Sequence, residues 1–186
     1  MARALAAVLD HDTFTVVVNV GDDDVIHGVH VAADLDTVMY TLAGIEGEHG
    51  WGRRNDNWSV MAEVGRLGGD TSFRLGDLDL ATCLLRTDAL GAGRRLSAIT
   101  SGLCTAHGVG PTVIPATDDE LRTRVQIDTG DWLDFQEYFV RRRHRDPGAA
   151  LAYTGSAEAA AAPGVLVAIA AADIVVFAPS YPPLSI

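Results

Sequence analysis

Residues 15–41, TVVVNVGDDDVIHGVHVAADLDTVMYT, constrain the fold more than any other stretch of the chain. The β-branched run at 16–18 ends at a glycine and three consecutive aspartates, which is the pattern of a buried strand followed by a loop. A second apolar stretch, at 25–31, leads to two further aspartates where a helix is predicted to begin. The sequence therefore predicts several carboxylates near one edge of a sheet.

These aspartates are candidate ligands for a metal ion. Asp22 and Asp23 follow the predicted strand, and Asp34 and Asp36 stand at the predicted helix start. Carboxylates packed closely together repel one another unless a cation or a proton offsets their charge, and hard oxygen ligands favour Mg²⁺. The spacing leaves a second interpretation open, in which the aspartates only accept hydrogen bonds from turn backbone or cap the helix.

Composition narrows the class of protein. The chain has 186 residues, 48% of them hydrophobic, which suits one domain over residues 1–186. A net charge of −11 argues against non-specific nucleic-acid binding. Short, interrupted apolar runs predict no membrane span, and the start of the chain resembles no signal peptide, so we expect a cytoplasmic protein. Cys83 and Cys104 lack metal-ligand spacing and are expected to be buried thiols.

The order of predicted elements indicates an α/β fold. Helices are predicted over residues 2–9, 36–45, 57–67, 97–107 and 157–171, and strands over 71–75, 109–114, 151–154 and 174–178. This alternation predicts a mostly parallel, three-layer, Rossmann-like sheet with helices on both faces. Residues 121–127 and 132–135, separated by DTGD, predict a small β-hairpin insertion.

Aromatic and basic residues allow two interpretations each. Trp51 and Trp58, in the loop GEHGWGRRNDNW, either stack on a flat ligand or cover the core, and core cover is the commoner role. Arg74 either holds a substrate phosphate or pairs with a neighbouring aspartate, and the ion pair is the commoner outcome. The arginines within 141–145 suit an anionic ligand, although such clusters are most often solvated.

Several motifs in one colinear order resemble a single family. They are VVVNVGDD, HGVHVAADLDTVMYTLAG, GWGRRNDNW, RLGDLDLAT, TDDELRT, FQEYFVRR and APSYPPLSI. Together they span nearly the whole chain, and they resemble the 2-phospho-L-lactate transferases, which are phosphoenolpyruvate transferases in actinobacteria. These enzymes build the deazaflavin coenzyme F420.

The resemblance implies a Mg²⁺-dependent transferase. Such an enzyme moves a phospholactyl or enolpyruvyl phosphate group from its guanosine diphosphate adduct to the deazaflavin Fo and releases GMP. By this likeness Asp22 and Asp34 would bind Mg²⁺ or the donor phosphate, and Asp36 and Arg74 would lie at the deazaflavin. Asp36 is also a candidate acceptor of the hydroxyl proton.

Further substrate-binding residues complete the expected site. They are Asp23 and Thr37, which neighbour the implied metal and deazaflavin residues, and Ser180, which follows the predicted strand 174–178. The implied partners are Fo and guanylylated phospholactate or phosphoenolpyruvate, with no nucleic acid and no membrane. The sequence leaves open which donor is used and whether two copies form a homodimer.

The chain also departs from the family pattern. The family opens with a glycine-rich strand and loop ahead of the first helix and continues past the position of Ile186, so we expect an incomplete domain that lacks its first strand and its C-terminal part. The family pattern has Arg, His and Asn where Leu78, Cys83 and Tyr181 stand. The alternative function is therefore a truncated, catalytically inactive deazaflavin-binding module.

Overall fold

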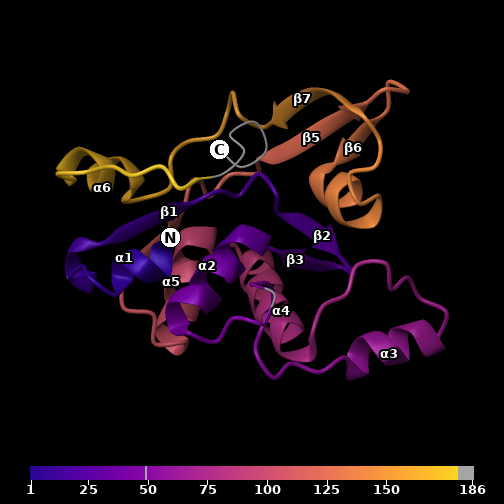
Figure 1. Cartoon of the computed structure of the whole chain (residues 1–186), viewed down its shortest axis with the longest axis horizontal. Coiled ribbons are helices and arrows are strands. Elements are labelled where there is room, and N and C mark those ends of the chain that lie inside the picture. The colour runs from indigo at the N-terminus through magenta and orange to yellow at the C-terminus, as the bar shows by residue number, and fades with distance from the viewer. Residues whose placement is uncertain (49, 180–186) are drawn as a thin grey trace.

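The computed structural model describes residues 1–48 and 50–179 of the chain. Its helices are α1 (Ala2–Ala6), α2 (Ala33–Ala43), α3 (Ser59–Arg66), α4 (Asp77–Gly91), α5 (Leu96–Ala106) and α6 (Val165–Ala171), with short helical turns η1 (His11–Thr13) and η2 (Glu137–Arg141). Its strands are β1 (Thr15–Val18), β2 (Asp24–Ile26), β3 (Val29–Val31), β4 (Thr112–Pro115), β5 (Arg122–Ile127), β6 (Trp132–Asp134) and β7 (Gly148–Thr154). Figure 1 shows their arrangement.

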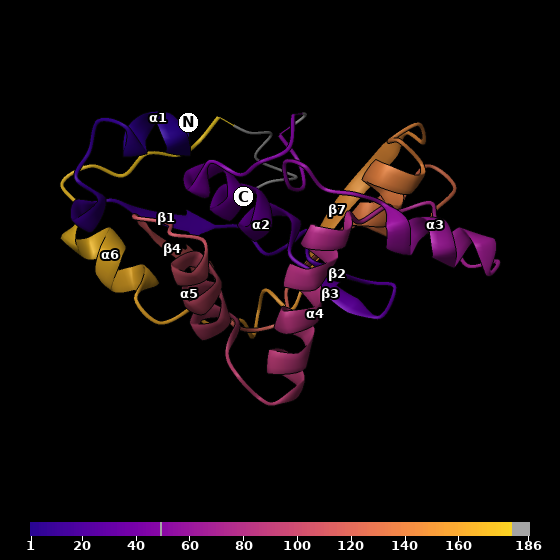
Figure 2. The same ribbon diagram turned by 90° about the horizontal axis from the view of Figure 1, so that it is seen from below.

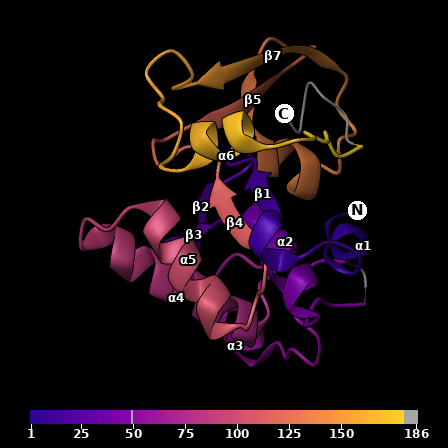
Figure 3. The same cartoon turned by 90° about the vertical axis from the view of Figure 1, so that its left-hand side faces the viewer.

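A parallel pair of strands, β1 and β4, lies at the centre of the fold (Figure 3). Val16 is opposite Val113, and both strands are rich in β-branched residues, which suit a pleated and largely buried surface. Val18 and Val113 belong to the main hydrophobic core together with Leu35, Met39 and other side chains of α2 and α5. These two helices therefore cover one face of the pair.

The opposite face of the pair is met by α6. Side chains alternate along a strand, so Ile114 points away from the face on which Val113 lies. Ile114 approaches Gly164, the residue directly before α6, and Val165 at the start of α6 is buried. Helices thus lie on both faces of a parallel pair, and the prediction of a three-layer α/β fold is confirmed.

A separate antiparallel sheet has the strand order β6–β5–β7 (Figure 1). In Figure 3 its strands β5 and β7 lie above β1 and β4. The β5–β6 hairpin is the one predicted from the sequence, and Val125 lies opposite Leu133. The strand predicted over residues 151–154 is part of β7, which pairs antiparallel with β5. The segment between β6 and β7 forms η2, a π-helical turn.

A second hairpin, β2–β3, lies directly after the aspartate loop. Its two-residue turn is His27-Gly28, with φ of 54° and 78°, and positive φ at both positions matches the twist that short hairpins require. Ile26 and Val29 pack with Leu75 and with Cys83 on α4, forming a second hydrophobic cluster. Residues 25–31, predicted as one apolar stretch, therefore contain a turn that the sequence pattern did not predict.

Two predicted strands are wrong. Residues 71–75 contain bends and irregular backbone, and residues 174–178 form no strand and are exposed. The β-branched residues at 174–176 favour extended backbone, but a strand also needs a hydrogen-bonded neighbour, and no described strand pairs with them. Within the described residues, no helix combines the length and apolar character required to cross a bilayer.

Arg86 is the largest fully buried side chain among the described residues. Its guanidinium pairs with the buried carboxylate of Asp36 on α2 and donates to the backbone carbonyl of His30 on β3 at 3.1 Å. One α4 side chain therefore connects three elements. These contacts explain how α4 is held against the hairpin.

Replacing Arg86 with Met should lower the free energy of unfolding by about 3–5 kcal/mol, because Asp36 would remain buried without its partner. Urea unfolding at pH 7 measures this change. The matched control is Arg94→Met, at an exposed position after α4, which should change stability by less than about 0.5 kcal/mol. The double variant Arg86→Met, Asp36→Leu should recover most of the loss, and an unchanged midpoint for Arg86→Met alone would contradict this role.

Candidate active site

A cavity of about 650 Å³ opens between α2, the start of α4, the loop before α3 and the segment around η2. Its lining divides into two kinds of side chain. The carboxylates are Asp22, Asp34, Asp36, Asp56 and Asp79, and the aromatic rings are Tyr40, Trp51, Trp58, Phe73, Phe135 and Phe139. Arg53 and Arg74 are the arginines among the described lining residues. The cavity thus contains an acidic region, formed by the carboxylates, and an apolar region, formed by the aromatic rings.

Asn19 organises the acidic region. Its side-chain amide donates to Asp34 Oδ2 at 3.0 Å, and its Oδ1 accepts from the backbone N–H of Gly21 at 2.9 Å. Gln136 supports the same loop by donating to the carbonyl of Asp22 at 2.8 Å. Asp34 lies in the first turn of α2 without acting as its cap. The interpretation of Asp34 as a helix cap is therefore wrong.

Burial disfavours the charged form of the Asp22 and Asp34 carboxylates when no cation is bound. Burial and the nearby charge of Asp34 raise the pKa of Asp22 to about 7, despite an opposing hydrogen bond from Asn19. Burial likewise raises the pKa of Asp34. Asp22 Oδ1 is buried and has no hydrogen-bond partner among residues 1–48 and 50–179. Two close carboxylates, one with a free oxygen, fit the oxygen-rich coordination of Mg²⁺.

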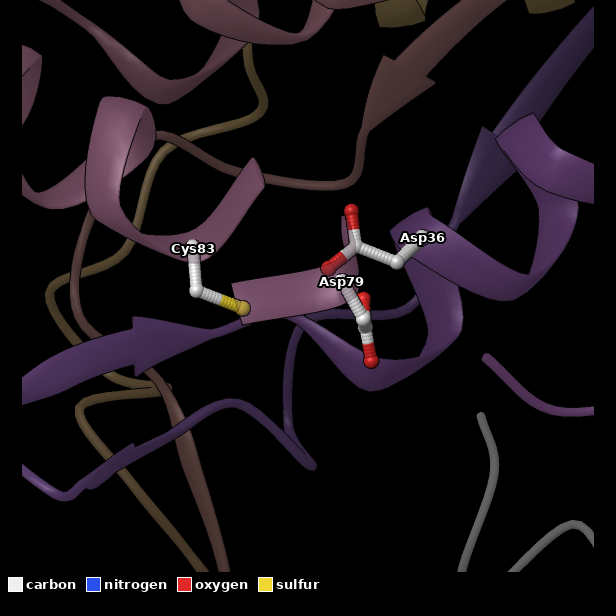
Figure 4. Close-up of side chains that lie close together, drawn as sticks. All are labelled: Asp36, Asp79 and Cys83. Carbon is white, nitrogen blue, oxygen red and sulfur yellow. The ribbon is translucent and has the colours of Figure 1, made fainter. Parts of the chain in front are cut away.

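A second close group consists of Asp36, Asp79 and Cys83, whose candidate ligand atoms lie within 4.8 Å of one another (Figure 4). Asp36 is already paired with Arg86, and Asp79 accepts a hydrogen bond from the Tyr40 hydroxyl at 2.9 Å. Burial and the neighbouring carboxylates raise the pKa of the Cys83 thiol to about 12, so the thiol stays protonated at neutral pH. These contacts suit a structural network better than a Mg²⁺ site.

Asp23 does not line the cavity. It is buried, with Oδ2 3.6 Å from Nε2 of His30. Burial raises the pKa of Asp23 well above its ordinary value, while burial and the charges of Arg86 and Arg122 lower the pKa of His30 to about 4. His30 is therefore neutral at pH 7, and the contact is no ion pair.

The apolar wall is built from stacked groups. Arg74 lies over the ring of Trp58 at 4.5 Å from its centroid and forms no ion pair with any described residue. Trp51 and Trp58 are 65% and 44% exposed. Core cover by the tryptophans and an ion pair for Arg74 are thus both wrong. Phe135 and Phe139 also line the cavity, and their rings stack with centroids 5.3 Å apart.

Asp56 lies in the loop between α2 and α3 that holds Trp51 and Trp58, here called the tryptophan loop. This loop runs past the first turn of α4, and Asp56 attaches it there (Figure 2). Its carboxylate accepts from the backbone N–H of Leu78 at 2.8 Å and of Asp79 at 3.1 Å, so it caps a helix whose own N-cap, Gly76, has no side chain. A Cβ at Gly76 would collide with the Asp56 carboxylate. Glycine at this position lets the loop approach the helix.

The cavity brings together most of the residues proposed from the sequence. Asp22, Asp34, Asp36, Thr37 and Arg74 all line it, Asp23 does not, and Ser180 lies outside the described residues. Asp79, Asp56 and Arg53 also line the cavity and were not predicted as site residues. Their motifs, RLGDLDLAT and GWGRRNDNW, were part of the resemblance, which was the only signal that could have identified them.

The family profile described as "2-phospho-L-lactate transferase CofD" matches residues 1–186. The phosphoenolpyruvate transferase of Mycobacterium leprae is 46% identical over 179 residues, covering 92% of this chain and 54% of that protein. The phosphoenolpyruvate transferase of Kitasatospora aureofaciens is 45% identical over 187 residues, covering 98% of this chain and 58% of that protein. The chain thus spans a little over half the length of these curated relatives.

The fold has a solved counterpart at low sequence identity. A Bacillus halodurans protein of the upf0052 family aligns with a TM-score of 0.56 and 15% identity, covering 92% of this chain and 52% of that one. This likeness supports the α/β fold, and the sequence matches establish the family. The chain belongs to the 2-phospho-L-lactate transferase family, CofD.

Proposed function

We propose that the chain forms the metal-binding and acceptor-binding region of a transferase of coenzyme F420 biosynthesis. The reaction moves a phospholactyl or enolpyruvyl phosphate group from its guanosine diphosphate adduct to a ribityl hydroxyl of Fo and releases GMP. The observation that carries the proposal is one cavity in which buried carboxylates adjoin stacked aromatic rings. Phosphoryl transfer requires an anionic donor and an alcohol to be held in line, and these two regions suit the two substrates.

Asp22 and Asp34 would hold Mg²⁺. Their raised pKa values and the free Oδ1 of Asp22 support this assignment, because a bound divalent cation would stabilise both charged forms. When bound, the ion would offset negative charge on the donor diphosphate. Asn19 and Gln136 keep the loop and the Asp34 carboxylate in position for this role.

The aromatic region would hold the deazaflavin. A flat tricyclic ring suits stacking against Trp58 and the Phe135–Phe139 pair, with Arg74 fixed beside it. Asp36 and Thr37, on the first turns of α2, both line the cavity and would orient the reacting hydroxyl. Because the Asp36 carboxylate is paired with Arg86, we assign Asp36 the role of positioning the reacting hydroxyl, in preference to the role of accepting its proton.

A second candidate is a deazaflavin-binding module without transfer activity. The stacked aromatic lining of the cavity favours it, since this lining can bind a flat ligand whether or not a donor is present. Fluorescence titration with Fo, run beside the turnover assay, separates the two functions. Binding without turnover favours the module.

The turnover assay combines the chain, Mg²⁺, the guanylylated donor and Fo, and it measures GMP and phosphorylated deazaflavin. Replacing Asp22 or Asp34 with Ala should abolish turnover while leaving the thermal midpoint intact or higher, because burial already disfavours both charged carboxylates. Asp88→Ala, at an exposed position on α4, is the matched control and should retain activity. Full activity of Asp22→Ala would overturn the metal assignment.

Mg²⁺ affinity should depend on pH through Asp22. The pKa of Asp22 is raised to about 7, and only the deprotonated form binds the ion, so the apparent affinity should fall by up to about tenfold per pH unit below pH 7 and level off above pH 8. Calorimetric titration between pH 5.5 and 8.5 measures this dependence. Asp22→Asn should bind Mg²⁺ weakly, and a wild-type affinity that stays constant across this range would contradict the assignment.

Arg74→Ala should weaken Fo binding by roughly tenfold, the upper range expected for loss of a partly desolvated cation and its stacked platform. Fluorescence titration with Fo gives the dissociation constant. Arg94→Ala removes the same charge from an exposed position outside the cavity and should leave this constant unchanged. Equal constants for the wild type and Arg74→Ala would remove Arg74 from the acceptor site.

A further inference from the structure

Arg53 lines the cavity but has no carboxylate partner among the described residues. The Nε atom of Arg53 is buried and makes no hydrogen bond to any described residue. A guanidinium presents its donors in a planar fork that matches carboxylate and phosphate oxygens. An unpaired guanidinium in a cavity lined by aspartates therefore has donor capacity that the described part of the protein leaves unused.

The position of Arg53 is set by its surroundings. The guanidinium lies over the ring of Tyr40, 5.6 Å from its centroid, and the Tyr40 hydroxyl is fixed by its bond to Asp79. The backbone of Arg53 pairs with Glu46 in an isolated β-bridge, and the N–H of Arg54 donates to the carbonyl of Ile45 at 2.8 Å. Both backbone and side chain are thus held before any ligand binds.

The charge balance of the cavity makes this cation significant. Asp36 is already paired with Arg86, and the Asp56 carboxylate is bonded to the backbone of α4. His107, whose ring meets the edge of Tyr40, supplies no second positive charge, because burial and the charge of Arg53 both lower its pKa. Arg53 is therefore a fixed positive charge on the side of the cavity formed by Tyr40.

We propose that Arg53 binds an anionic oxygen group of the donor, a phosphate or a carboxylate, and positions the donor against the acceptor. This inference rests on the proposed function for the identity of the donor, whereas the anion site itself follows from the contacts of Arg53. Arg53 acts on the donor, while Arg74, stacked on Trp58, acts on the acceptor.

The test compares Arg53→Gln with Arg54→Gln. Arg54 is the adjacent residue, carries the same charge and donates to the carbonyl of Gly44 at 2.8 Å outside the cavity lining, so it controls for long-range electrostatics. Calorimetric titration with inorganic pyrophosphate in Mg²⁺, and separately with lactate, distinguishes a phosphate site from a carboxylate site. Arg53→Gln should lower affinity for one of these anions at least about tenfold, and Arg54→Gln should change it less than about twofold.

Fo binding shows whether the cavity remains intact in each variant. Arg53→Gln should bind Fo as tightly as the wild type, and in the full reaction it should raise KM for the donor more than it lowers kcat. Unchanged anion affinity in Arg53→Gln, no anion binding by the wild type, or an equal loss of Fo binding would each overturn the inference. Arg53-dependent pyrophosphate binding in a chain that transfers nothing to Fo would refute the proposed function and leave the anion site standing.

Discussion

The ion pair between Arg86 and Asp36 is the contact on which the site depends. It lies at the junction of α2, α4 and β3, and Arg86 also donates to the carbonyl of His30. α2 carries Asp34, Thr37 and Tyr40, and α4 carries Asp79, so the distance between the two helices fixes the acidic region. Two ions this deeply buried are costly to desolvate, and only their mutual contact and further hydrogen bonds offset that cost.

The cavity holds acidic and basic side chains that are not paired with one another, and this arrangement suits its proposed ligands. Asp22 and Asp79 have pKa values raised to about 7 and 6, in each case first by burial and then by a neighbouring carboxylate. Arg53 and Arg74 are nevertheless held on aromatic rings and are not paired with these acids. The separation of unpaired negative and positive groups favours a ligand set that contains both a cation and an anion.

The sequence predicted the acidic region well because its residues are close in sequence. Asp22, Asp34, Asp36 and Thr37 surround one strand end and one helix start, and local patterns place them there. Asp79 could not be found in this way, since its position beside Asp36 depends on how α4 packs. The sequence left two roles open for Trp51 and Trp58 for a related reason. A loop tryptophan covers the core or lines a cavity according to tertiary contacts that periodicity does not encode.

The errors in the fold have equally local causes. The His27-Gly28 turn was missed because His-Gly is not among the dipeptides, such as Asn-Gly and Asp-Gly, that strongly indicate a two-residue hairpin turn. Residues 174–178 have strong β propensity but no described strand beside them. The β1 strand and the β5–β6 hairpin were predicted because each has its apolar pattern and its flanking turn residues in one continuous stretch. The pairing of β1 with β4 joins segments far apart in the sequence and was not predicted.

The cap that Asp56 places on α4 has a consequence for how the cavity can adapt. One of the two N–H groups it accepts from belongs to Asp79, whose own carboxylate faces the acidic region. A ligand that displaced the tryptophan loop would also release the backbone of Asp79 and disturb its bond with Tyr40. The apolar and acidic regions of the cavity are therefore coupled through Asp56 and Asp79, so a rearrangement of one region would disturb the other.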